Sequence, residues 1–179
     1  MSLQFNLLGP LNIESDGEPS ELLKSPKGCA LVTYLIVTGQ THRREFLADL
    51  LWEASSTAQA LHNLRTLLNR IRSLVPELQI TRTSLAFQPL SETSVDFLRL
   101  QAALEGDAVQ IDDSQLDSAL QLYRGDLLAN FYLEGAPRFE EWLFLEREHL
   151  RQKIQASYKR LCKTYLEAEQ CKNNRTSSS

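Results

Sequence analysis

The hydrophobic period of this chain changes three times, and this limits the folds that it can adopt. Residues 3–22 alternate apolar and polar side chains, with turns at Gly9-Pro10 and Asp16-Gly17, which is typical of short antiparallel strands. From Pro26 to about residue 75 the apolar residues recur every three or four positions, as in an amphipathic helix. Residues 78–87 alternate again around Arg82-Thr83-Ser84, which predicts a hairpin. Two strands, helices and a hairpin in this order predict a small α+β unit.

Turn and capping residues divide the helical stretch into three helices. Pro26 opens the first helix and Gly39 ends it. We expect Thr41 to be the N-cap of a second helix that includes REFLADLLWE. The segment Ser55–Thr57 caps the third helix, which we expect to stop near Pro76.

From Val95 the pattern is wholly helical. The spacing predicts helices over 96–106, closed by Gly106, and over 113–123 and 137–170, the last opened by Pro137. We therefore predict an α+β N-terminal domain over residues 1–93 and an all-α domain over residues 94–172. The polar end KNNRTSSS places a disordered tail at residues 173–179.

Composition restricts the class of protein. The net charge is −4, with 8 Lys+Arg against 9 Asp+Glu in residues 1–95 and 11 against 14 afterwards, so any site for an anion must be local. Cys29, Cys162 and Cys171 lie far apart without a CxxC spacing, as expected of free thiols in a reducing cytosol. No segment reaches the roughly 18 apolar residues of a membrane span. We expect a cytoplasmic protein.

The third helix, ALHNLRTLLNRIRSLV over residues 60–75, has polar positions without a single Asp or Glu. A helix fits the major groove of B-DNA, where arginine binds guanine or phosphate and asparagine reads adenine. Three helices with the third presented, followed by a hairpin that touches the neighbouring groove, form a winged helix-turn-helix. On a helical wheel Arg65, Thr66, Asn69 and Arg70 point away from the apolar stripe, with His62 and Arg72 at its margins. Arg82, beside Thr83 at the hairpin tip, is placed to enter a narrow minor groove.

The sequence leaves other interpretations open. Surface helices often carry arginine for solubility alone, and winged helices and paired helices also serve as docking sites for proteins. A protein-interaction module that no longer binds DNA is therefore the alternative. The three histidines, His42, His62 and His149, are isolated, and no nucleophile has an evident base. We expect no catalytic residue, no metal site and no cofactor.

The order of three motifs resembles a known family. The segments FNLLGPLNIESDGE, SPKGCALVTYLIVTGQTHRREFLADLLWE and NLRTLLNRIRSL are similar to the OmpR/PhoB-like winged helix of AfsR/SARP-type bacterial transcriptional activators. In the second half, VDFLRLQAAL and ALQLYRGDLLANFYLEGAPRFEEW resemble the bacterial transcriptional activation domain that follows it.

The resemblance implies a fold and a function. It implies tetratricopeptide-like helical pairs in the second domain, binding to promoter DNA, and recruitment of RNA polymerase. It assigns DNA contact to the third helix, with His62 and Asn63 as early-helix contacts, then Arg65, Thr66, Asn69, Arg70 and Arg72. The wing departs from the family pattern, with Ser84-Leu85 in place of Gly-Tyr and Ala86 in place of a basic residue. Either Arg82 supplies its contact or the wing contributes little.

The helix from Pro137 carries more apolar residues than its neighbours can cover. Its apolar positions extend to Tyr165 and Leu166, whereas only two shorter helices precede it in the second half. We therefore predict that its end meets a second subunit or a further domain.

Overall fold

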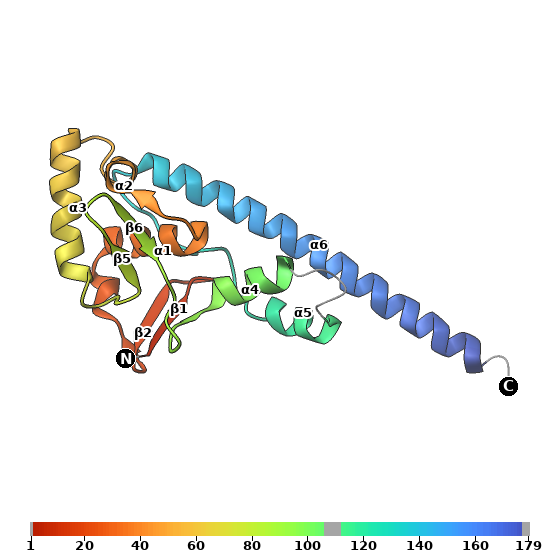
Figure 1. Ribbon diagram of the computed structural model, residues 1–179. Coiled ribbons are helices and arrows are strands. Elements are labelled where there is room, and N and C mark those ends of the chain that lie inside the picture. The colour runs from red at the N-terminus through yellow and green to blue at the C-terminus, as the bar shows by residue number, and fades with distance from the viewer. Residues whose placement is uncertain (1, 106–111, 177–179) are drawn as a thin grey trace.

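The N-terminal strands form a sheet that also includes the chain just before the helical half. The computed structural model describes residues 2–105 and 112–176, with side chains up to residue 167 (Figure 1). Strands β1 (Leu3–Asn6), β2 (Asn12–Ser15), β3 (Glu18–Pro19) and β7 (Ser94–Val95) lie in the order β3-β2-β1-β7. Phe5 is opposite Ile13 of the antiparallel β2 and Val95 of the parallel β7, and all three side chains are buried. The predicted alternation therefore buries one face of this sheet.

The first helix, α1 (Pro26–Thr38), is the centre of the N-terminal half. It follows a short 3-10 helix, Glu21–Lys24, and every side chain from Cys29 to Val37 is buried. Ser25 accepts a hydrogen bond from the Gly28 amide at its start. Gly39 ends it in the left-handed conformation, at φ 60°, as the sequence predicts.

A second sheet packs beside α1 and α2. It contains β4 (His42–Arg43), β6 (Ser84–Phe87) and β5 (Leu78–Ile80), in the order β4-β6-β5. The predicted hairpin is therefore present as β5 and β6. The prediction that Thr41 caps the second helix is wrong, because residues 42–43 pair with β6 and α2 (Arg44–Leu51) has Arg43 as N-cap, without a side-chain bond.

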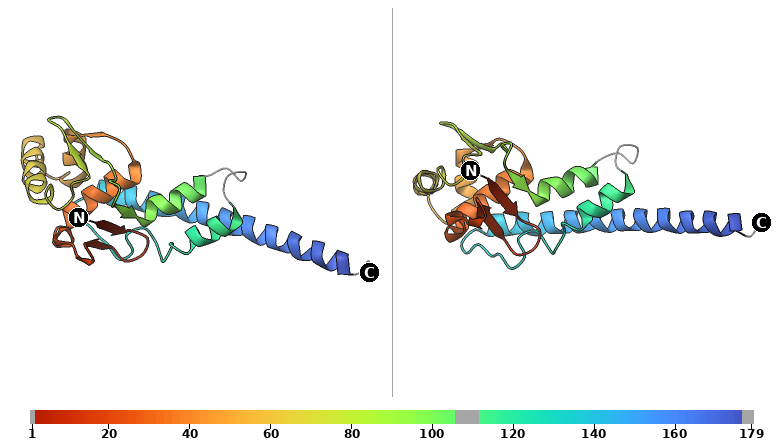
Figure 2. Two further views of the ribbon diagram at one scale, coloured as in Figure 1. Left: turned by 60° about the horizontal axis from the view of Figure 1, so that its bottom comes forward. Right: turned by 90° about the horizontal axis from the view of Figure 1, so that it is seen from below.

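The described residues of the second half form three helices: α4 (Asp96–Glu105), α5 (Asp113–Leu120) and α6 (Pro137–Thr176). Helix α5 is three residues shorter than expected, and the predicted closure of α4 by Gly106 lies outside the described residues. Helix α6 has 40 residues, or about 60 Å at 1.5 Å per residue, and extends well beyond α4 and α5 (Figures 1 and 2). It continues to Thr176, into the segment expected to be a disordered tail.

The two halves meet through a buried carboxylate and an aromatic cluster. Asp96 accepts hydrogen bonds from the backbone amides of Leu7 and Leu8, at 2.8 and 3.0 Å. The rings of Tyr34 and Trp142 lie 4.6 Å apart between α1 and α6. The helical half therefore packs directly against the N-terminal half. Within the described ranges, no helix combines the length and the apolar character that crossing a bilayer requires.

Candidate nucleic-acid interface

Helix α3 (Thr57–Ile71) forms one edge of the molecule (Figure 1). Ser56 is its N-cap and accepts a hydrogen bond from the Gln59 amide at 3.3 Å. Its inner side chains Ala60, Leu64, Leu67, Leu68 and Ile71 are all buried, at helical spacing, against the N-terminal core. The helix ends at Ile71, earlier than expected, and a tighter turn follows in which the Leu74 amide donates a hydrogen bond to the Ile71 carbonyl at 2.9 Å.

The predicted contact residues of α3 lie on its outer side, with one exception. The side chains of His62, Arg65, Thr66, Asn69, Arg70 and Arg72 are exposed. Asn63 is half-buried on a flank, where its Oδ1 accepts a hydrogen bond from Gln59 Nε2 at 2.8 Å. Its amide is therefore already engaged within the helix.

The hairpin tip lies next to the start of α2. Arg82 and Thr83 are exposed at the turn between β5 and β6. Thr81 Oγ1 accepts a hydrogen bond from the Ser84 amide at 2.9 Å, which closes this turn without a glycine. The Arg44 amide donates to the Thr83 carbonyl at 2.9 Å. The tip is therefore tied to the first residue of α2, beside α3.

Arginines differ in their partners between the two halves. In the helical half Arg124, Arg138, Arg151 and Arg160 pair with carboxylates, and Arg147 donates to the carbonyls of Leu127 and Leu128. Among the described residues, none of the arginines of the N-terminal half has an acidic partner: Arg43, Arg44, Arg65, Arg70, Arg72 and Arg82. The sequence contains no Asp or Glu from residue 54 to residue 76. These six guanidinium groups therefore form no ion pair within the described part of the chain.

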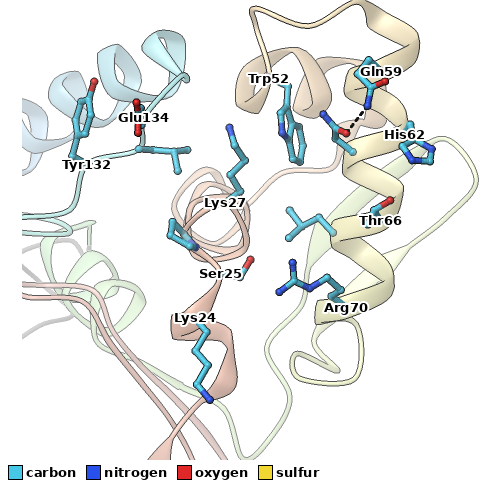
Figure 3. Close-up of a pocket in the computed structure, with 14 residues that line it drawn as sticks. Lys24, Ser25, Lys27, Trp52, Gln59, His62, Thr66, Arg70, Tyr132 and Glu134 are labelled. Atoms are coloured by element: carbon cyan, nitrogen blue, oxygen red, sulfur yellow. Dashed lines mark hydrogen bonds between the residues drawn. The ribbon is translucent and has the colours of Figure 1, made fainter.

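A groove of about 800 Å³ runs along one flank of α3, between this helix and the start of α1 (Figure 3). Arg70 enters it from α3, and Lys24 and Lys27 enter it from the other side. Lys24 pairs with Glu21 at 2.7 Å. Lys27 donates to the Leu51 carbonyl and lies 5.0 Å from the centre of the Trp52 ring, and burial lowers its pKa. Arg70 is therefore the cation of this groove that is free to bind an outside group.

A smaller pocket, of about 310 Å³, lies on the opposite flank of α3. Its lining includes Arg65 and Arg72 from α3 and Arg44 from α2. Arg44 was not predicted as a site residue, because its place beside α3 arises only from the packing of α2 and the pairing of β4 with β6. The neighbouring pair Arg43-Arg44 was the one signal in the sequence.

The described part of the chain offers little other chemistry. No three side chains of His, Cys, Asp or Glu within it are placed to hold a metal ion. The His42 ring forms a hydrogen bond with Thr38 Oγ1 at 2.8 Å and packs beside the Tyr34 ring. These contacts give this histidine a role in packing. Trp52 and Trp142 pack partly buried against the core.

Comparison with known proteins shows a likeness in sequence to a regulatory protein and a likeness in fold to a solved structure. No protein-family model matches the chain. It is 30% identical over 138 residues, 72% of this chain, to the regulatory protein AfsR of Streptomyces coelicolor, of which it spans 14%. Its fold is similar to that of Mycobacterium tuberculosis EmbR, solved in complex with a low-affinity phosphopeptide, with a TM-score of 0.62 over 87% of this chain and 44% of that one, at 22% identity. The sequence match confirms the resemblance that the motifs predict: over 72% of its length the chain is similar to a regulatory protein of the AfsR type.

Proposed function

We propose that this protein is a DNA-binding transcriptional activator that recognises promoter DNA through α3. In this proposal residues 1–93 form a winged helix-turn-helix, with the β5–β6 hairpin as its wing, and the helices after residue 94 form a tetratricopeptide-like domain. The observation that carries the proposal is that three exposed arginines of α3, Arg65, Arg70 and Arg72, have no acidic partner among the described residues. Unpaired guanidinium groups on an exposed helix suit the phosphates and base edges of duplex DNA.

The arrangement of the side chains supports this function. The central exposed positions His62, Thr66 and Asn69 would face the base edges in a major groove, which accommodates one helix. Arg70 on one flank and Arg65 with Arg72 on the other would face the two strands. Arg82 at the tip of the wing would reach the adjacent minor groove.

Selection of binding sites from random duplexes, followed by fluorescence anisotropy titration of the selected duplex, tests the proposal. Replacing Arg70 by alanine should weaken binding by about 1–3 kcal/mol if its guanidinium binds a base or a phosphate. Arg99→Ala on α4 is the matched control, because Arg99 is exposed and Figure 1 places α4 well away from α3. Equal affinity of Arg70→Ala and wild type would move the contact surface away from α3.

The alternative is a protein-interaction module, favoured by the apolar residues that α6 exposes. Tyr158, Tyr165 and Leu166 are 46%, 55% and 59% exposed, and every side chain from Cys162 to Glu167 is exposed. Salt distinguishes the two functions, because log affinity for DNA falls steeply with log salt concentration whereas an interface of apolar groups responds weakly. A shallow slope for the selected duplex would favour the alternative.

We also propose that, while α3 binds DNA, the helical half contacts a protein partner. This partner is RNA polymerase or a second subunit. The exposed end of α6 supports contact with a second copy or with a further domain. Sedimentation equilibrium should show a dimer that Tyr165→Glu dissociates if the occupant is a second copy. A monomer at every concentration would rule out the second copy.

A further inference from the structure

Three arginines converge on the pocket of about 310 Å³ beside the wing. It is lined by Arg44, Arg65, Leu68, Asn69, Arg72 and Ile80. Half of these residues carry a guanidinium group, and none carries a carboxylate. Three positive charges around one pocket repel one another, and an anion between them would relieve this repulsion.

Arg44 has the least compensated charge of the three. Its side chain is half-buried, and its Nε is buried without a hydrogen-bond partner among the described residues. No carboxylate in the described ranges pairs with it. A partly buried charge without a counter-charge is unfavourable, and an anion outside the protein would relieve it. The Arg44 amide is bonded to the Thr83 carbonyl, so the backbone that carries this side chain is held against the wing.

Arg65 and Arg72 share one flank of α3. They are seven residues apart, or about two turns, so both project toward α2 and β5 rather than straight outward. When a helix lies in a major groove, its central positions face the base edges and its flanks face the sugar-phosphate strands. Arg65 and Arg72 are therefore placed for the strand, together with Arg44.

We propose that Arg44, Arg65 and Arg72 bind neighbouring phosphates of one DNA strand, and that Arg65 and Arg72 contribute affinity rather than base recognition. Guanidinium groups bind phosphate through forked, charge-assisted hydrogen bonds. The inference rests on the proposed function, and it leaves sequence recognition to the central positions His62, Thr66 and Asn69.

The test compares the salt dependence of Arg44→Gln with that of wild type on two duplexes, one of random sequence and one obtained by selection. Loss of one phosphate contact should lower the log–log salt slope by about 0.9, which corresponds to about fivefold weaker binding at 0.15 M salt. Both duplexes should lose affinity by the same factor, so the ratio of selected to random affinity should not change. Arg65→Gln and Arg72→Gln should behave in the same way, whereas Thr66→Ala should lower the ratio.

Two variants separate charge from folding. Arg44→Lys keeps a positive charge and should keep the slope. Arg44→Gln removes an uncompensated charge and should not lower the thermal midpoint of the free protein. Arg99→Gln on α4 is the charge-matched control and should leave the slope unchanged.

The outcomes are distinct. An unchanged slope for Arg44→Gln, with the wild type binding duplex DNA, would overturn the phosphate site and leave the proposed function intact. A changed affinity ratio for Arg65→Gln or Arg72→Gln would return these residues to base recognition. Failure of the wild type to bind either duplex would overturn the proposed function and this inference together.

Discussion

Asp96 holds the two halves of the molecule together, and its replacement by asparagine should be strongly destabilising. Its side chain is 5% exposed. Oδ1 accepts hydrogen bonds from the amides of Leu7 and Phe97, at 2.8 and 2.7 Å, and Oδ2 accepts from the Leu8 amide at 3.0 Å and from Arg124 at 3.2 Å. All four partners are hydrogen-bond donors. A carboxylate can accept from all of them, whereas a carboxamide has only one oxygen that accepts.

The cost follows from these bonds. With its oxygen at the Oδ1 position, asparagine would direct its NH₂ group at the Leu8 amide and the Arg124 guanidinium. An unsatisfied buried amide costs about 1–3 kcal/mol, and a bond to a neutral acceptor is about 1 kcal/mol weaker than one to a charged acceptor. We expect a loss of about 3 kcal/mol in the free energy of unfolding, or roughly 6–12 °C in the thermal midpoint for a chain of this size.

Urea and thermal unfolding, followed by circular dichroism, measure this loss. Asp49→Asn is the control, because Asp49 pairs with Arg138 at the surface and both side chains are about half exposed. Such a pair is worth about 0–1 kcal/mol. If the two variants shifted the midpoint equally, the hydrogen bonds of Asp96 would not stabilise the junction, and the reasoning would be refuted.

Two further predictions concern buried titratable groups. Burial raises the pKa of the Cys29 thiol to about 12, so at pH 8 iodoacetamide should modify the exposed Cys162 and leave Cys29 unmodified until the protein unfolds, as peptide mass spectrometry would show. Burial lowers the pKa of His42, so the unfolded chain takes up a proton first as the pH falls below about 6.5, and acid should lower the free energy of unfolding. Urea titrations between pH 7.5 and 5.5 should show a smaller loss in His42→Asn, and parallel curves would contradict this cause.

Local patterns predicted the elements of the fold well, and long-range pairing explains the errors. The strands at Phe5 and Ile13, the end of α1 at Gly39 and the β5–β6 hairpin follow from alternation and turn chemistry within a few residues. Thr41 looked like an N-cap because a helix follows it. The pairing of His42 with Leu85 extends the chain there instead, and that partner is more than forty residues away. The boundary between residues 93 and 94 stays a prediction.

The exposed face of α3 could also be predicted from a local pattern. Its apolar spacing determines which side is buried, so the exposure of Arg65, Arg70 and Arg72 follows directly. Arg44 could not be found in this way, because its contact with α3 depends on how α2 packs. The engagement of Asn63 by Gln59 also needed side-chain geometry, since both residues are polar and four positions apart.

Net charge was a poor guide to the potential at this face. The protein has four more acidic than basic residues, yet several acids bind arginines of the helical half, among them Asp96, Asp113 and Asp126. At physiological salt a charge farther away than about 8–10 Å is largely screened. A phosphate next to α3 would therefore respond to the unpaired guanidinium groups within that distance and very little to the carboxylates along α6. Since the arginines of α3 form no ion pair within the described part of the chain, a chain with pI of about 5.4 can present a locally positive surface to a polyanion.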